Sequence, residues 1–292
     1  MAMKSLSLFD LAPGKLLLDR FKILKTNRMG GMSTTFAVDD PKSKGSREIQ
    51  VFPAALFEGV EQAHDFAEAM KAWKKVDSKH VLPTREVHAL EDGTILFVTD
   101  LPAGETMRTW HKEGVALPPS EVVAIGVQLL DGLSKIHAEG LVHGDIKPHT
   151  IHVEAGKKGL RVMLVDGGIT PALWAAKHLG DKTALIGTPF YAPVEQFGGE
   201  SPDVQSDVYN VATALYELAA GVLPWRGKSF LEVFQAKLEK RPPSMRSRAP
   251  KSDVPLELEA VIEGGLMADK KERYADAKTF KKKLEGLKNL DG

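Results

Sequence analysis

The stretch His143-Gly144-Asp145-Ile146-Lys147-Pro148 places a carboxylate close before an ammonium group, between a predicted helix and a predicted strand. Upstream, apolar residues recur at spacings of three and four from Val122 to Ile136, and Gly140 is placed to end that helix. Downstream, Leu160–Val165 is typical of a strand. The polar stretch therefore forms the connection between two regular elements.

The rest of the C-terminal part is predicted to be mainly helical. The segment 207–220 is apolar on nearly every side and is closed by Gly221, which is typical of a helix in the centre of its lobe. The segment 256–287 also has a helical pattern, with an exposed, solvated face that includes Lys281–Lys283. Between them, the polar, proline-containing segment 241–253 predicts a loop.

The N-terminal part has a different pattern, in which short β-like runs alternate with turn residues around one helical stretch, Glu61–Val76. The runs are Phe21–Leu24, Thr35–Val38, Ile49–Phe52 and Thr94–Val98. This pattern predicts a small sheet that carries one helix.

Composition is that of a globular protein, with 43% apolar and 27% charged residues among 292. The 39 basic side chains balance 39 acidic ones, so no overall field favours nucleic acid or an anionic membrane as a partner. Cysteine is absent, which excludes disulfides and thiolate chemistry. Without a recognisable signal peptide or membrane span, the sequence predicts a cytoplasmic location.

Motifs at several further places resemble the catalytic core of eukaryotic-like Ser/Thr protein kinases of the bacterial type, in the same order and at the same spacing. Together with residues 143–148 they are Met29–Ser33, Val165–Gly168, Gly187–Tyr191, Ser206–Tyr209, Leu223–Trp225 and Glu272–Tyr274. The resemblance extends from Leu16 to Leu287.

This resemblance implies an α+β, bilobal fold, with a small β-rich N-lobe carrying one helix and a larger helical C-lobe. The expected boundaries are an N-terminal extension at 1–14, the N-lobe at 15–101, the C-lobe at 102–287 and a tail at 288–292. Gly30 and Gly31 correspond to the family's glycine-rich loop, although Arg28 at the first glycine position also favours a simple tight turn.

Several charges that phosphoryl transfer requires are missing by this comparison. Gln50 replaces the lysine that pairs with the α and β phosphates, and Ala69 replaces that lysine's glutamate partner. In the catalytic loop, Asp145 stands at the position of the base and Lys147 at that of the phosphate-steadying lysine, but Thr150 replaces a metal-binding asparagine. Catalytic roles for Asp145 and Lys147 are therefore interpreted as vestigial.

The metal and adenine positions are altered too. Asp166 remains as a magnesium ligand, but Gly167 replaces the phenylalanine that normally follows it. Polar residues stand where the family places apolar contacts to the base, and the hinge ends in a proline, which has no N–H to donate to a purine. The polar residues are Thr35, Glu48 and His152, and the hinge residues are Thr99 (the gatekeeper), Asp100 and Pro102.

The resemblance implies that the scaffold of the large lobe is retained. Glu195 and Arg273 match a buried ion pair, Asp207 matches the residue that bonds the catalytic-loop backbone, and His143 matches a core histidine. A metal site formed by His143, His149 and His152 is the less favoured interpretation of these histidines.

Regulation by phosphorylation also lacks its usual partner. Gly144 replaces the arginine that would receive an activation-loop phosphate, which leaves Thr183 and Thr188 without that cation. The segment that follows is expected to be held by the Glu195–Arg273 ion pair instead.

The sequence therefore predicts a pseudokinase, a kinase-like module that binds a protein partner, with no cofactor expected. In this interpretation Asp145 and Asp166 serve the scaffold. The alternative is an atypical active kinase with ATP and magnesium, in which Asp145 is the base, Asp166 holds the metal, and Arg28 or Lys25 replaces the missing lysine.

One prediction concerns the space that Gly167 leaves in place of a phenylalanine ring. Trp73, on the helix of the small lobe, is expected to fill it and to lie near His143. Trp73→Ala should then lower the free energy of unfolding by about 3 to 5 kcal/mol, the range for emptying a buried aromatic site. Thermal denaturation measures this, and a variant that melts like the parent would refute the idea.

Overall fold

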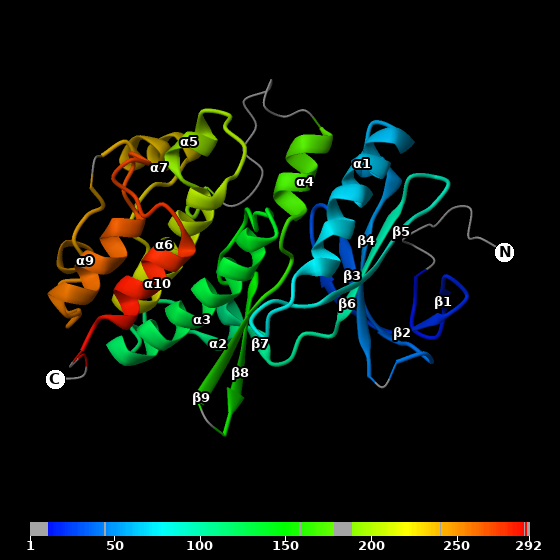
Figure 1. The fold of residues 1–292 in the computed structure, drawn as a ribbon, viewed down its shortest axis with the longest axis horizontal. Coiled ribbons are helices and arrows are strands. Elements are labelled where there is room, and N and C mark those ends of the chain that lie inside the picture. The colour runs from blue at the N-terminus through cyan, green and yellow to red at the C-terminus, as the bar shows by residue number, and fades with distance from the viewer. Residues whose placement is uncertain are drawn as a thin grey trace. The chain divides into compact units, whose positions relative to one another are not determined.

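A computed structural model describes residues 11–43, 45–157, 159–177, 189–239, 241–288 and 290. The chain divides into two compact units. The first comprises residues up to Asp77, Leu82–Pro102 and Ala175–Lys177, and the second comprises Ser78–Val81, Ala103–Trp174 and the residues from 178 onward. The predicted bilobal class, a β-rich lobe with one helix and a larger helical lobe, is confirmed (Figure 1).

The first unit contains an antiparallel sheet in the order β1-β2-β3-β4-β6-β5. The four predicted runs lie in β2, β3, β4 and β6, whereas β1 and β5 were not predicted. The strands are β1 (Leu16–Leu17), β2 (Phe21–Met29), β3 (Thr34–Asp39), β4 (Arg47–Phe52), β5 (Thr84–Ala89) and β6 (Ile95–Asp100). β1 is too short, and β5 too polar, to show an apolar run.

The two faces of this sheet differ because successive side chains of a strand point to opposite sides. Ile49 and Val51 of β4 belong to the apolar core, together with Phe36, Leu96 and Val98. Glu48 and Gln50 point to the other side, where the strand register places Thr99 opposite Glu48 and Thr35 opposite Gln50. The sheet thus gathers the polar residues singled out above on one face.

The predicted helix Glu61–Val76 is present but changes its geometry near the end. α1 (Val60–Lys71) continues as a 3₁₀ turn, η3 (Ala72–Lys75), and a further 3₁₀ turn, η2 (Ala54–Leu56), precedes α1. Buried Phe66 packs its ring 5.0 Å from that of Phe52, which fixes α1 on the sheet. A 3₁₀ turn at a helix end is common, because it satisfies the last carbonyls with a tighter turn.

The second unit holds most of the helices and a three-stranded sheet in the order β7-β8-β9. Its elements are β7 (Glu105–Thr106), α2 (Met107–Trp110), α3 (Pro119–Ala138), β8 (Ile151–Gly156), β9 (Gly159–Leu164), α5 (Val194–Phe197), α6 (Val204–Ala220), α7 (Phe230–Lys237), α8 (Met245–Arg248), α9 (Leu256–Gly265) and α10 (Ala277–Glu285), while α4 (Ile169–Ala176) runs from this unit into residues assigned to the first. Among the described residues, no helix is both long and apolar enough to cross a membrane.

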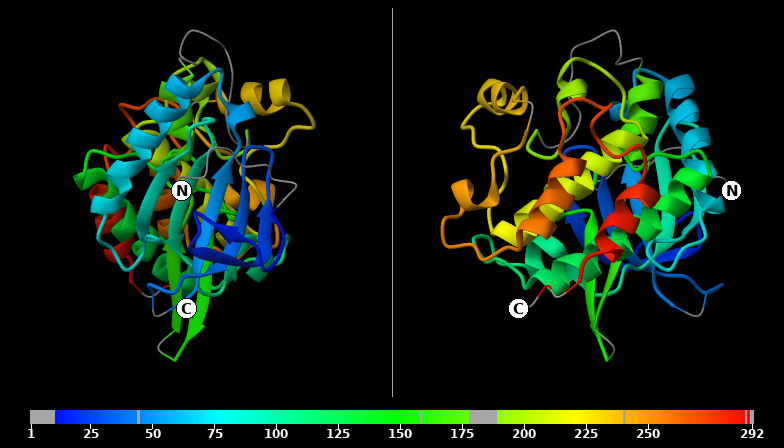
Figure 2. Two further views of the ribbon diagram at one scale, coloured as in Figure 1. Left: turned by 90° about the vertical axis from the view of Figure 1, so that its right-hand side faces the viewer. Right: turned by 60° about the vertical axis from the view of Figure 1, so that its left-hand side comes forward.

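The predicted central helix is α6, and every residue from Ser206 to Ala220 is buried. It packs against α3, α9 and α10 of the same unit (Figure 2). Asp203 and Ser206 form a capping box at its start, and Gly221, with φ 71°, ends it in the left-handed conformation. The prediction of a buried helix closed by glycine is confirmed.

The prediction of one helical segment from Leu256 to Leu287 is wrong, because two helices, α9 and α10, flank an irregular connection. At the end of α9, a Cβ on Gly265 would lie 2.6 Å from the Cβ of Ala212, so only glycine permits the close approach to α6. Asp276 then caps α10 by accepting the N–H of Thr279. The predicted loop 241–253 contains the short helix α8, and α7 was missed.

Two glycines in the same backbone conformation allow the cost of a close approach to be measured. Gly140 and Gly221 both have φ 71°, but a Cβ would meet nothing within 4 Å at Gly140, whereas at Gly221 it would lie 3.0 Å from the carbonyl carbon of Gly114. Gly140→Ala should cost about 1 to 2 kcal/mol of unfolding free energy for the left-handed backbone alone. Gly221→Ala should cost more in urea denaturation, and equal losses would contradict this account.

Candidate functional site

The segment 143–150 connects α3 to β8, and a buried carboxylate of α6 holds its backbone. Asp207, which is 0% exposed, accepts the N–H of His143 at 2.8 Å and that of Gly144 at 2.7 Å. His137, near the end of α3, places Nε2 3.0 Å from the same carboxylate. The expected bonding of Asp207 to the loop backbone is present, and it ties α3, the loop and α6 together.

Gly144 is required by the backbone and by its surroundings. Its φ is 80°, and a Cβ would lie 2.5 Å from Cγ and Cδ of Pro171. An arginine at this position would therefore displace the Pro171 ring as well as strain the backbone. The two threonines that such an arginine would serve, Thr183 and Thr188, lie outside the described residues.

His143 is fully buried and packs in the core of this unit, as expected. Its Nε2 lies 3.1 Å from the carbonyl of Val165, and burial lowers the pKa of the imidazole, which favours the neutral ring. His152 lies on β8, with Nδ1 3.3 Å from the carbonyl of Ala103. Within the described ranges, no three His, Asp or Glu side chains gather as a metal site.

Asp145 and Lys147 form an ion pair, in which Nζ of Lys147 donates to the carboxylate at 2.6 Å. Burial raises the pKa of Asp145, against the effect of the neighbouring ammonium. The Thr150 hydroxyl donates to the carbonyl of Asp145 at 2.7 Å and accepts the N–H of Lys147 at 3.0 Å. Thr150 therefore uses its single O–H within the loop.

Asp166 follows β9 in a left-handed backbone conformation, with φ 59°, which is uncommon for a residue other than glycine. Gly167 beside it is buried, and the N–H of Gly168 donates to the carbonyl of His143 at 3.0 Å. Trp73, in η3 of the other unit, is 5% exposed. Its contact with Gly167 stays a prediction.

In the first unit, Gly30 and Gly31 belong to a tight turn between β2 and β3. The N–H of Gly30 donates to the carbonyl of Ser33 at 2.9 Å. Gln50, 8% exposed on β4, donates its side-chain amide to the hydroxyl of Ser33 at 2.9 Å. Gln50, which the resemblance places at the lysine position, thus binds the turn.

Glu48 is 4% exposed and lies on the same face of β4. Its carboxylate accepts hydrogen bonds from Asn27 at 2.8 Å and from the guanidinium of Arg28 at 3.0 Å, both on β2. A buried carboxylate requires such partners, because an unpaired one would be costly. Arg28 thus neutralises the charge of Glu48, and Asn27 adds a second hydrogen bond to the carboxylate.

The hinge residues lie at the end of β6 and directly after it. Thr99 is buried, and Asp100 accepts a paired interaction from Arg85, at 2.8 and 2.6 Å, and also pairs with Arg47. Pro102 is partly exposed and ends the segment Leu82–Pro102 of this unit. The carboxylate of Asp100 is thus held within the sheet.

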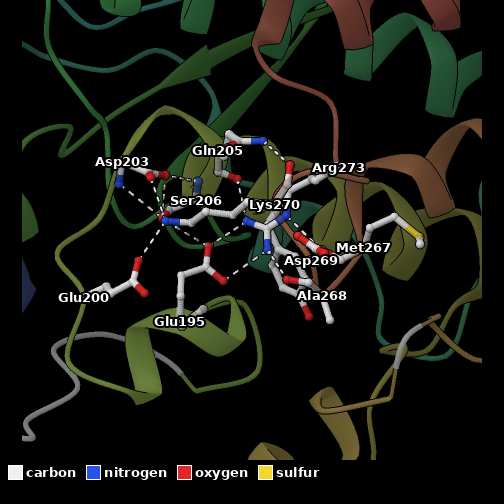
Figure 3. Close-up of polar contacts among 12 residues, drawn as sticks. Glu195, Glu200, Asp203, Gln205, Ser206, Met267, Ala268, Asp269, Lys270 and Arg273 are labelled. Atoms are coloured by element: carbon white, nitrogen blue, oxygen red, sulfur yellow. Dashed lines mark hydrogen bonds and ion pairs between the residues drawn. The ribbon is translucent and has the colours of Figure 1, made fainter.

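The expected ion pair between Glu195 and Arg273 is present in the second unit (Figure 3). Nη1 and Nη2 of Arg273 donate to the two carboxylate oxygens at 2.7 and 3.1 Å. The remaining guanidinium hydrogens bond the carbonyls of Gln205, Met267 and Ala268, so all five donors are used. The side chain is 0% exposed, and the pair joins α5 to the loop between α9 and α10.

Sequence reasoning missed the contacts that satisfy the polar residues of this site. Asn27 and Ser33 bond Glu48 and Gln50, and Pro171 packs against Gly144. Ser33 belongs to the motif Met29–Ser33, but the resemblance carries no signal for its bond to Gln50 or for the roles of Asn27 and Pro171, because these contacts exist only after folding. In the alternative interpretation Arg28 or Lys25 of β2 would bind phosphate, whereas in the structure Arg28 bonds Glu48.

Comparison with known proteins agrees with this fold. The protein kinase domain family matches residues 54–284, a range that begins after β4 and so leaves out Gly30, Gly31 and Gln50. A probable serine/threonine-protein kinase PknB of Lactococcus lactis is 26% identical over 280 residues, which cover 95% of this chain and 43% of that protein. Serine/threonine-protein kinases PknA of Corynebacterium glutamicum is 31% identical over 220 residues, covering 74% and 46%.

Among solved structures, the PknI kinase domain of Mycobacterium tuberculosis is similar with a TM-score of 0.72 and 21% identity, covering 94% of this chain and 98% of that one. The chain belongs to the protein kinase domain family and has the bilobal protein kinase fold. It spans less than half the length of the two curated relatives.

The Glu195–Arg273 pair should be a main source of stability in its unit. Arg273→Met leaves the Glu195 carboxylate buried without its guanidinium partner, and we expect a loss of about 3 to 5 kcal/mol of unfolding free energy. The control is Lys270→Met, since Lys270 binds Asp203 and Glu200 from a partly exposed position and should cost at most about 1 kcal/mol. Urea denaturation followed by circular dichroism measures both, and similar losses would contradict the assignment.

Proposed function

We propose that this chain is a pseudokinase, a kinase-fold module that binds a protein partner and transfers no phosphate. The observation that carries the proposal is Gln50. A neutral amide stands where the family has its phosphate-binding lysine, and that amide donates to Ser33 of the turn between β2 and β3. Phosphoryl transfer depends on charge neutralisation, and this position supplies no charge.

Glu48 supports the proposal for a second reason. It lies on the sheet face where the family places an apolar contact to the base, and it brings a negative charge to that face. Arg28, one of the cations that could replace the missing lysine, is bonded to Glu48. Moving Arg28 to a phosphate would take a guanidinium partner away from a buried carboxylate, which is costly.

The donor set for magnesium fits poorly as well. Asp166 is one carboxylate, and the Thr150 hydroxyl at the asparagine position donates to the loop backbone. Magnesium prefers an octahedral set of oxygen ligands, often including carboxylates. The residues present therefore do not fit magnesium and ATP, and we assign no step through either.

The alternative is an atypical active Ser/Thr kinase with Asp145 as base and Asp166 on the metal. A specific observation keeps it testable: Lys25 is exposed on β2, which β3 separates from β4, the strand that lacks the lysine. In this alternative, the Asp145–Lys147 pair would retain its catalytic role.

The first test is a calorimetric titration with ATP, with and without magnesium. We expect no saturable binding up to about 1 mM, because the site lacks a phosphate cation and a hinge N–H and carries a charge at the base. A thermal shift assay with the same ligands is the control for heat effects. Nanomolar or low micromolar affinity would overturn the proposal.

The second test restores the lysine alone. Gln50→Lys should not create kinase activity, because Glu48, Thr150 and Gly167 remain. Glu48 lies two positions away on the same face of β4, so the new ammonium would pair with it. Autophosphorylation with labelled ATP measures this, with the unmodified chain as the control.

Robust labelling of the Gln50→Lys protein would show that Glu48, Thr150 and Gly167 do not prevent phosphoryl transfer. The double variant Gln50→Lys/Glu48→Ala separates the two strand positions, because it supplies the cation and removes the competing carboxylate. Activity in the double variant alone would assign the main defect to Glu48.

A further inference from the structure

Lys237, the last residue of α7, is 1% exposed. Its Nζ donates to the carbonyl of Phe190 at 2.8 Å and to that of Ala192 at 2.6 Å. Lysine is almost never fully buried unless its ammonium group is paired. Here the hydrogen-bond acceptors are main-chain carbonyls of a segment more than forty residues earlier in the chain.

Aromatic rings and charged groups complete the surroundings of this amine. Nζ lies 4.9 Å from the ring centre of Tyr209 on α6 and 5.8 Å from that of Phe197 on α5, distances at which a cation is attracted to a ring. The charges that act on it are Glu195 on α5, which favours the ammonium, and Arg273, which opposes it. Burial dominates and lowers the pKa of Lys237 well below its ordinary value.

In the segment that Lys237 holds, side chains donate to three successive main-chain carbonyls. Those of Phe190 and Ala192 accept from Lys237, and that of Tyr191 between them accepts from Asn210 of α6 at 2.9 Å. The Tyr191 hydroxyl in turn bonds Glu217 of α6. Buried backbone carbonyls must find partners, and in this irregular segment a single amine supplies two of them.

We propose that Lys237 is the positioning residue for Phe190–Ala192, an internal amine whose N–H groups fix this segment, which follows the predicted activation-loop threonines, without a phosphate. The proposal does not rest on the absence of catalysis, because an active kinase would need the same segment held. It predicts that the order of residues 190–198 depends on the amine of Lys237 and not on the volume of its side chain.

The absence of cysteine from the sequence permits a matched test. Lys237→Cys introduces a single thiol, which is alkylated in denaturant before refolding. With 2-bromoethylamine the thiolate displaces bromide and restores an amine at nearly the length of lysine. With 1-bromopropane the same reaction gives an uncharged chain of similar size. The parent protein, taken through the same unfolding and refolding, is the control.

Hydrogen–deuterium exchange measured by mass spectrometry then compares peptides from 190–198 with peptides from α6. We expect the propyl protein to exchange about tenfold faster or more in 190–198, since two hydrogen bonds are lost, with α6 unchanged. The aminoethyl protein should return to the exchange of the parent. Equal exchange in the two alkylated proteins would overturn the proposal.

A second measurement uses the unmodified chain and does not depend on refolding. With lysine labelled at Nζ with nitrogen-15, the amine of Lys237 should give a slowly exchanging NMR signal with proton contacts to the Tyr209 ring. Failure to observe such a signal under conditions where the folded protein gives a dispersed spectrum would refute the positioning role. Neither result depends on nucleotide binding, so this proposal and the proposed function can fail separately.

Discussion

The buried carboxylate of Asp207 is the interaction on which the second unit depends. It accepts two backbone N–H groups of the loop at 143–150 and contacts His137 at the end of α3. A buried carboxylate is stable only when its oxygens are bonded, so α6, the loop and α3 must keep this arrangement together. The full burial of α6 from Ser206 to Ala220 supplies the rigid support that this requires.

The same unit uses buried basic side chains to hold irregular segments. Arg273 places all five of its donors on Glu195 and three carbonyls, and Lys237 bonds the carbonyls of Phe190 and Ala192. Both lie against Tyr209 of α6. Segments without regular secondary structure need such partners, because their buried carbonyls have no ladder of hydrogen bonds. The central helix thus organises both ends of the segment around α5.

The candidate site contrasts with this scaffold in how its polar groups are used. Gln50 bonds Ser33, Glu48 bonds Arg28, and Thr150 bonds the backbone of its own loop. These groups, which the resemblance places at nucleotide-site positions, are hydrogen-bonded to other parts of the chain. Such internal satisfaction stabilises each unit by itself, and it supports a module whose fold needs no bound ligand.

Much of the fold was predictable from local pattern. The four β runs, the helix ended near Gly140 and the apolar helix closed by Gly221 follow from periodicity and capping, which act over a few residues. The prediction of a single helix over 256–287 was wrong, because the helical pattern of the sequence continues across the irregular connection between α9 and α10. That connection is held open by Arg273, whose partners lie on α5 and α6.

The sequence by itself determined the family and the class of fold, because these depend on residue type and order, and it singled out the residues of the candidate site. Only the tertiary structure decided what the altered residues contact. Pairing of β2 with β3 and of β3 with β4 brings Asn27 and Arg28 to Glu48, and packing brings Pro171 to Gly144 and Lys237 to Phe190. Such contacts join residues far apart in the chain, and hydrogen bonds and steric limits that form only on folding leave no periodic trace in the sequence.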